Sequence, residues 1–190
     1  VRCEGAGIIL TGNQGSDPGF HEGEAASSWA SWATDNSSAL VFSGVLDVDQ
    51  YVASLSGEPD LVCWLLGTDG VIDAADPDAY IAAELAHAET ILAAWPGADH
   101  AILLTLPGNA RQAAFDAEFT GDKANRWRWR QRQHALVTAF AAALAGREAD
   151  GIYVVPTHTA VDPVTGYDAT DATMPNASGM ASLADVVSSF

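Results

Sequence analysis

The stretch Asp60-Leu61-Val62-Cys63-Trp64-Leu65-Leu66-Gly67 (DLVCWLLG) is apolar at every position between its two ends. A strand with one face in water alternates apolar and polar residues, whereas a strand covered on both faces is apolar throughout. The stretch therefore predicts a strand inside a parallel sheet that has helices on both sides. Similar apolar runs predict further strands at residues 6–11, 38–43, 101–106 and 151–155.

Helical patterns lie between these runs. A first helix is predicted over residues 23–34. Asp76 and Pro77 form a typical helix start, and apolar residues recur at helical spacing from there to Trp95. A long helix over about 122–146 and a last helix complete the series; their inward residues are Trp129, Leu136, Phe140 and Leu144, then Leu183, Val187 and Phe190. The alternation predicts an α/β fold, a three-layer α/β/α sandwich with a five-stranded parallel, flavodoxin-like sheet.

Length and composition fit one domain over residues 1–190. The chain is 48% hydrophobic, which suits a single α/β domain with a sizeable core. No apolar run approaches the length of a membrane span, and no signal peptide is visible, so we expect a soluble protein without membrane insertion. Because the chain begins at Val1, we expect a processed product, an alternative start or a domain excised from a longer chain.

Charge and cysteine content narrow the classes of partner. Asp and Glu number 25 against 8 Lys and Arg, a formal net charge of −17, which argues against nucleic acid as a partner. Cys63 lies in an apolar strand and is expected to be a small buried hydrophobe. Neither cysteine has metal-type spacing, and no disulfide framework is implied. We expect no metal and no cofactor.

Four short segments, in chain order, resemble the conserved blocks of the SGNH (GDSL-type) hydrolases. They are Gly12-Asn13-Gln14 after the first strand, Gly44 after the second, Gly67-Thr68-Asp69-Gly70 after the third, and Asp171-Ala172-Thr173-Met174-Pro175-Asn176-Ala177-Ser178-Gly179. The resemblance covers nearly the whole chain and implies the SGNH hydrolase fold. Ligand sites in open parallel sheets lie beyond the carboxyl ends of the strands, which is where these segments are expected.

The resemblance also implies that the family's ester-hydrolase chemistry has been lost. The nucleophilic serine of the family falls on Gln14, the oxyanion-hole asparagine on Asp69 and the histidine base on Met174. An amide is no nucleophile, a thioether takes no proton at neutral pH, and a carboxylate opposes a developing oxyanion. Among the catalytic positions, Gly44, whose N–H would donate to the oxyanion, and Asp171, which would orient the histidine, keep the family's residue. We expect a catalytically degenerate domain.

A displaced set of residues is the alternative. Ser16 lies two residues past the nucleophile position and His158 follows the strand at 151–155. With Asp171 they would form a Ser-His-Asp set, and the chain would then deacylate acetylated carbohydrates. A serine in a turn rich in Gly, Asn and Asp is more often part of the turn itself.

A non-catalytic domain would bind a ligand at the same rim or serve as a structural module. The resemblance implies a carbohydrate, because SGNH-like domains occur in cell-surface and phage-tail proteins that meet acetylated glycans, hence an extracellular or virion-associated setting. The candidate ligand-binding residues are Asn13, Gln14, Gly44, Asp69, Trp29 and Trp32. The two tryptophans share a helix face at i,i+3 and would form either a stacking platform or part of the core.

Charged groups suggest two further sites. Arg126, Arg128, Arg130 and Arg132 form i,i+4 pairs on the long helix and represent either a solvated face or a docking patch for an acidic partner, including a second copy of the chain. Asp69 and Asp171, joined by Asp47 or Asp73, would offer carboxylates to a hard cation such as calcium. Mutual repulsion relieved by hydrogen bonds or by a raised pKa is the alternative for these aspartates.

Overall fold

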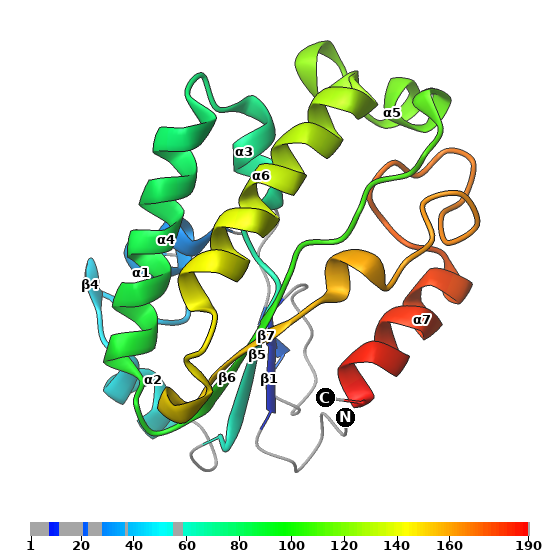
Figure 1. Cartoon of the computed structure of the whole chain (residues 1–190). Helices are drawn as coiled ribbons and strands as arrows, with labels where there is room; N and C mark the ends of the chain where they lie inside the picture. Colours follow the sequence, from blue (N-terminus) through cyan, green and yellow to red (C-terminus); the bar gives the residue numbers. More distant parts are fainter. Residues whose placement is uncertain (1–7, 12–20, 23–27, 37, 55–58, 190) are drawn as a thin grey trace.

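The structure is a computed structural model that describes residues 8–11, 21–22, 28–36, 38–54 and 59–189. The chain is an α/β protein with a parallel sheet and helices packed on it (Figure 1). In the described part of the chain, no helix has the length and apolar character that crossing a membrane requires.

The main sheet is parallel throughout and has the strand order β2-β1-β5-β6-β7. Its strands are β1 (Ile8–Thr11), β2 (His21–Glu22), β5 (Leu61–Trp64), β6 (Asp99–Leu103) and β7 (Ile152–Val155). The apolar run quoted above is the central strand, as its lack of alternation predicts. β6 begins two residues earlier than predicted, because Asp99 and His100 extend its pairing with β5 and β7.

The predicted strand at 38–43 is wrong in length and in partner. Only β3 (Val41–Phe42) is extended there, and it pairs antiparallel with β4 (Val45–Leu46) in a separate ribbon. Ser43 and Gly44 both have positive φ, 52° and 82°, as a two-residue hairpin turn of the primed type requires. The turn folds β3 back onto its neighbour in sequence, and the short β2 lies next to β1 instead.

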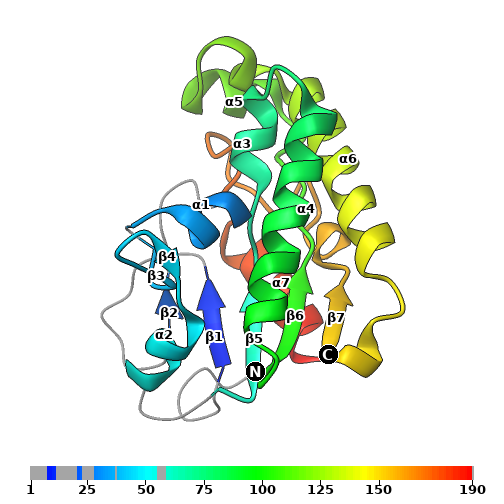
Figure 2. The same ribbon diagram turned by 90° about the vertical axis from the view of Figure 1, so that its left-hand side faces the viewer.

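One face of the sheet carries the larger core. Val62 and Trp64 of β5 and Ile102 of β6 point into it, and it is closed by α1 (Trp29–Thr34), α4 (Pro77–Ala94) and α6 (Arg126–Leu144). The predicted inner stripe of the long helix is confirmed, since all four of its residues are buried: Trp129, Leu136, Phe140 and Leu144. Figure 2 shows α4 and α6 in front of the sheet.

The alternate residues of the same strands form a smaller cluster on the opposite face. Cys63, Ala101, Leu103 and Val155 pack there against the last helix, α7 (Ala177–Ser188). Cys63 is buried as a small hydrophobe, as predicted. Helices therefore cover both faces, with α7 behind the sheet in Figure 2. Leu183 and Val187 are half-buried, and Phe190 lies outside the described residues.

Short helices are the elements that the sequence pattern does not predict. They are α2 (Val48–Ser54), α3 (Thr68–Asp73) and α5 (Gln112–Glu118), with the 3-10 turns Glu148–Asp150 and Thr157–Thr159. A further 3-10 turn, Gly121–Ala124, lies where the long helix was predicted to begin, and α6 itself begins at Arg126. Each of these short elements has two turns or fewer, which is too short for hydrophobic periodicity to register. By contrast, the predicted start of α4 is confirmed: Asp76 accepts a hydrogen bond from Ala79 N at 3.1 Å, with Pro77 in the first turn.

Candidate functional site

The carboxyl ends of β5, β6 and β7 open onto three connections. β5 continues through Gly67, which has a φ of 95°, into α3. β6 continues through Thr105 to the buried Asn109, and β7 runs into the 3-10 turn that contains His158. Asp69 lies in the first turn of α3, and Met174 lies on the loop before α7. The segments after β5, β6 and β7 thus begin at the carboxyl ends of the strands, where the sequence predicts a ligand site.

A buried carboxylate lies beside Gly67. Glu84 of α4 is 1% exposed and accepts hydrogen bonds from the backbone N–H groups of Trp29 at 2.7 Å and Ala30 at 3.3 Å. Burial raises the pKa of Glu84, and these two backbone hydrogen bonds oppose the rise. Glu84 therefore joins the start of α1 to α4. Its stabilising contribution is complete below the ordinary carboxyl pKa and declines as pH rises through the folded value.

His100 is a buried neutral histidine. Its Nδ1 accepts a hydrogen bond from Trp64 Nε1 at 3.0 Å, so the proton is on Nε2, which lies 2.8 Å from Trp95 O. Burial lowers the pKa of His100, and the neighbouring Trp95 carbonyl and Asp99 carboxylate counter part of this effect. With both ring nitrogens used inside the core, His100 is structural.

The lowered pKa of His100 predicts acid sensitivity. A group with a depressed pKa stabilises the fold above its unfolded pKa, about 6.5 for histidine, and this contribution is lost as pH falls through the folded pKa. We expect the free energy of unfolding in urea to fall between about pH 7 and 5, and His100→Leu to flatten that fall while being less stable at pH 8. Glu84 acts in the opposite direction and is present in both proteins. Parallel pH profiles for parent and variant would contradict the prediction.

Asn109 ties the loop before α7 to the end of β6. Its side chain is fully buried, and its Nδ2 donates to the backbone oxygens of Asp168 at 2.7 Å and Asp171 at 2.8 Å. Its Oδ1 accepts from Arg111 N at 3.0 Å, and its own N–H donates to Ala172 O at 2.7 Å. The sequence pattern did not identify Asn109. Its only signal in the sequence is an asparagine shortly after an apolar strand.

Met174, where the sequence resemblance places the histidine base of the SGNH hydrolases, lies on this loop. Met174 is 60% exposed. The residues before it are held by Glu118 of α5, which accepts hydrogen bonds from Ala172 N at 2.6 Å and Thr173 Oγ1 at 3.1 Å. The half-buried Asp171 contributes its carbonyl to Asn109. The loop is therefore ordered by main-chain contacts, and the Met174 thioether extends from it toward solvent.

His158 lacks the partner that a catalytic histidine needs. Its Nδ1 is buried and has no hydrogen-bond partner among the described residues, so Asp171 does not orient it. Burial lowers its pKa, and the charge of His134 lowers it further. Among the described side chains, no histidine forms an ion pair with a carboxylate. The triad geometry of a base held by an acid is missing from this end of β7.

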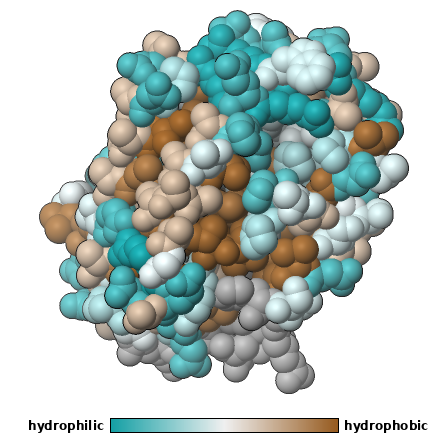
Figure 3. Space-filling model, in the orientation of Figure 1, coloured by the Kyte–Doolittle hydropathy of each residue, from teal (hydrophilic) through white to brown (hydrophobic). Residues whose placement is uncertain are grey.

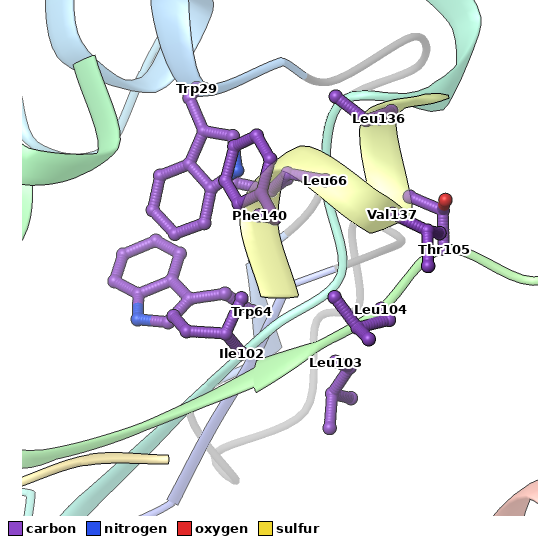
Figure 4. A pocket seen from close by; sticks show the side chains of 10 residues that line it. All are labelled: Trp29, Trp64, Leu66, Ile102, Leu103, Leu104, Thr105, Leu136, Val137 and Phe140. Atoms are coloured by element: carbon purple, nitrogen blue, oxygen red, sulfur yellow. The ribbon is translucent and has the colours of Figure 1, made fainter. Parts of the chain in front are cut away.

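The two predicted stacking tryptophans belong to the core. Trp29 and Trp32 are 1% and 2% exposed. Their rings lie 5.2 Å and 5.9 Å from the ring of Trp64, and Trp29 also stacks on Phe140 at 6.0 Å. Between Trp29, Trp64, Phe140 and Thr105 is a cavity of about 10 Å³ (Figure 4). It has the volume of one water molecule and is no ligand pocket.

Two buried threonines, Thr105 just after β6 and Thr157 just after β7, provide a matched stability test. Thr105 Oγ1 is buried without a partner among the described residues, whereas Thr157 Oγ1 donates to Leu104 O. We expect Thr105→Val to raise the free energy of unfolding by about 1 kcal/mol and Thr157→Val to lower it by about 1–2 kcal/mol. Denaturant titration of both variants measures the difference. Equal effects of the same sign would show that hydrogen bonding does not distinguish the two sites.

The arginine row divides into two pairs with different surroundings. Arg128 and Arg132 face α3: Arg128 Nε donates to Ile72 O at 3.2 Å, and Arg132 Nη1 donates to Val71 O at 2.9 Å and to Ala74 O. These two arginines donate hydrogen bonds to carbonyls at the carboxyl end of α3. The prediction that they belong to a solvated face is therefore wrong for this pair. Arg126 Nη1 donates to Ala110 O on another segment.

Two of the aspartates proposed as cation ligands, Asp47 and Asp73, make separate contacts elsewhere in the fold. Asp47 Oδ1 accepts from Gln50 N at 2.9 Å in the first turn of α2, and Asp73 pairs with Lys123 at 3.1 Å. Within the described ranges, no three His, Cys, Asp or Glu side chains are grouped as a metal site would require.

The remaining predicted site residues are placed only in part. Asn13, Gln14 and Ser16 lie outside the described residues, and the side chain of Asp69 is likewise not described. Gly44 lies in the exposed turn of the β3–β4 ribbon rather than after a strand of the main sheet. The convergence of Gln14, Gly44, Asp69 and Met174 therefore stays a prediction.

Comparison with known proteins supports the fold. No protein-family model and no curated protein matches the chain. Among solved structures, the chain is similar to "The structure of a putative platelet activating factor from Streptococcus pneumonia", with a TM-score of 0.56 and 15% identity over 88% of this chain and 70% of that one. Identity this low shows a shared fold alone.

Proposed function

We propose that this chain is an SGNH-type hydrolase-fold domain, with the flavodoxin-like sheet of that family, that has lost ester hydrolysis and acts as a non-catalytic ligand-binding module. The observation that carries the proposal is the state of the base: Met174 is an exposed thioether on the loop before α7, and no described histidine is paired with a carboxylate. Without a base, a serine hydroxyl at this rim would remain protonated and unreactive.

The direct test is turnover of p-nitrophenyl acetate. We expect the unmodified chain to stay at the background rate. Restoring Gln14→Ser, Asp69→Asn and Met174→His together should raise the rate by at least about 100-fold, because base, nucleophile and oxyanion donor act as a unit. Each single reversion should do almost nothing.

The same assay tests the alternative of a displaced catalytic set. Robust hydrolysis by the unmodified chain, abolished in Ser16→Ala or His158→Ala, would overturn the proposal and identify an ester hydrolase. The unpaired Nδ1 of His158 speaks against that outcome, because a triad histidine needs its second nitrogen held by an acid. His134→Gln is the matched control, since it alters the neighbouring histidine without touching the set.

Carbohydrate is the ligand class that we propose for the rim. With Trp29 and Trp32 in the core, binding would rest on polar groups of Asn13, Gln14 and Asp69. A glycan array with neutral and acetylated sugars should register binding that weakens in Gln14→Ala or Asp69→Ala. Full retention in both variants would exclude the rim, and a blank array would favour a purely structural module.

A further inference from the structure

Basic residues are concentrated in one internal segment of this acidic chain. Six of the eight Lys and Arg residues fall between positions 111 and 132. The start of α6 and the neighbouring α5 lie together at the top of Figure 1, and the space-filling view shows hydrophilic residues gathered over this end (Figure 3). Three of the six have their charge accounted for by internal contacts: Lys123 with Asp73, Arg128 with Asp122 and Arg132 with the end of α3.

The other three, Arg111, Arg126 and Arg130, are related through two residues, Ala110 and Tyr167. Arg126 donates to Ala110 O, next to Arg111, whose Nη1 lies 3.4 Å from Tyr167 O. The Tyr167 hydroxyl donates to Pro107 O. Burial raises the pKa of this phenol, and the nearby charge of Arg130 opposes the rise. Arg126 and Arg111 therefore bind the carbonyls of Ala110 and Tyr167, and the charge of Arg130 acts on the hydroxyl of the same Tyr167.

None of these three arginines has an acidic partner among the described residues, where every ion pair within 4.0 Å involves other cations. Each guanidinium has five N–H donors, and the described contacts use one donor of Arg111 and one of Arg126. Arg111 is exposed and the other two are half-buried, so free donors remain accessible.

Their arrangement works against the stability of the helix. Arg126 and Arg130 are like charges at i,i+4, and α6 has no acidic residue in its first turn. Positive charge near the amino end of a helix is unfavourable, and like charges at this spacing repel. A bound anion would relieve both effects at once. Arg128 and Arg132 have the same spacing but are compensated by Asp122 and by the carbonyls of α3.

An exposed aromatic ring adjoins the group. Trp127 is 60% exposed, and the guanidinium of Arg126 lies over its ring at 4.3 Å. An arginine held on an indole is oriented for hydrogen bonding in the plane of its fork. Exposed indole faces also stack on the apolar face of a sugar ring. A ligand that suits both features carries a planar anion next to a saccharide ring.

We propose that Arg111, Arg126, Arg130 and Trp127 form a binding site for an acidic saccharide, with the arginines binding its carboxylates and Trp127 contacting a ring. Two competing partners fit less well. A second copy of the chain carries the same charge of −17, so long-range repulsion opposes its approach, and the high charge density of nucleic acid meets the same repulsion. A short uronate chain carries only a few negative charges, so the long-range repulsion that it meets is weaker. The site uses none of the rim residues, so it stands independently of the proposed function.

Calorimetric titration with tetragalacturonate tests the site, with its fully methyl-esterified form as the uncharged control and inorganic phosphate as the free-oxyanion control. We expect the uronate to bind and the ester not to bind. The variant R126Q/R130Q should weaken binding at least about tenfold, and raising NaCl from about 0.05 M to 0.3 M should weaken it as well. Phosphate should bind more weakly than the uronate, because it offers nothing to Trp127.

The matched control is Arg147→Gln, which removes a cation paired with Glu89 and Asp150 beyond the far end of α6 and should leave uronate binding unchanged. Thermal unfolding of each variant confirms that it is folded. Equal binding of ester and uronate, unchanged binding by R126Q/R130Q, or no uronate binding would overturn the site. Sedimentation should show a monomer; a salt-sensitive dimer lost in R126Q/R130Q would assign the arginines to a second copy instead.

Discussion

Replacing Trp64 by alanine is expected to lower the free energy of unfolding by about 3–5 kcal/mol, the range for removal of a large aromatic side chain from a core. Trp64 is 1% exposed and lies at the centre of an aromatic cluster, 5.2 Å from Trp29, 5.9 Å from Trp32 and 6.3 Å from Trp95. Its removal would also leave His100 Nδ1 buried without a donor. A loss of this size is a large fraction of the stability of a typical domain.

Urea unfolding, followed by circular dichroism, measures this effect. Trp64→Phe keeps much of the ring packing and removes only the indole N–H, so it should cost less than the alanine variant and remain folded if that variant is not. Trp127→Ala removes the same side chain from an exposed position and should change stability by less than about 0.5 kcal/mol. A cost for Trp127→Ala close to that of Trp64→Ala would contradict the assigned core.

The second large effect is expected at Asn109. Asn109→Ala removes two hydrogen bonds to the backbone oxygens of Asp168 and Asp171 and one from Arg111 N, all made by a fully buried side chain. At about 1 kcal/mol for each, the loss is about 3 kcal/mol. Urea unfolding measures the loss, and limited proteolysis should cut the 160–175 loop faster in the variant.

Asn176 is the control for Asn109. It is also an asparagine that orders the start of α7, accepting from Gly179 N at 3.0 Å and donating to Thr165 O at 3.0 Å, but it is half-buried. As a helix N-cap it should cost about 1 kcal/mol when replaced by alanine. If Asn109→Ala cost no more than Asn176→Ala, then the proposed attachment of the loop to β6 would be wrong.

The sequence predicted the layers of this fold well and its short elements poorly. The central strand at 61–64 and the long helices α4 and α6 were identifiable, because unbroken apolar runs and long helical stripes each reflect burial directly. The hairpin at Ser43 and Gly44 was missed although Ser-Gly is a common turn dipeptide, because the resemblance assigned Gly44 to the end of a main-sheet strand. The apolar run before it was therefore assigned to the wrong sheet.

The location of the site stays a prediction, and the structure corrects the interpretation of several of its proposed members. Trp29 and Trp32 share a helix face, but the sequence does not say whether that face meets solvent or Trp64. Likewise, the i,i+4 spacing of the arginines does not reveal that Arg128 and Arg132 serve α3 while Arg126 and Arg130 do not. Partners distant in sequence decide both questions, and only the three-dimensional arrangement supplies them.

The way the loop before α7 is held also bears on how such a protein evolves. Asn109 and Glu118 bind almost entirely to main-chain groups of residues 168–172, and these groups are the same whatever side chain follows at position 174. Selection for a folded domain therefore places little restraint on Met174, which is 60% exposed. A lineage that no longer needed a base here would be free to drift at this position and still inherit an intact scaffold, and the reverse change would be equally open to it.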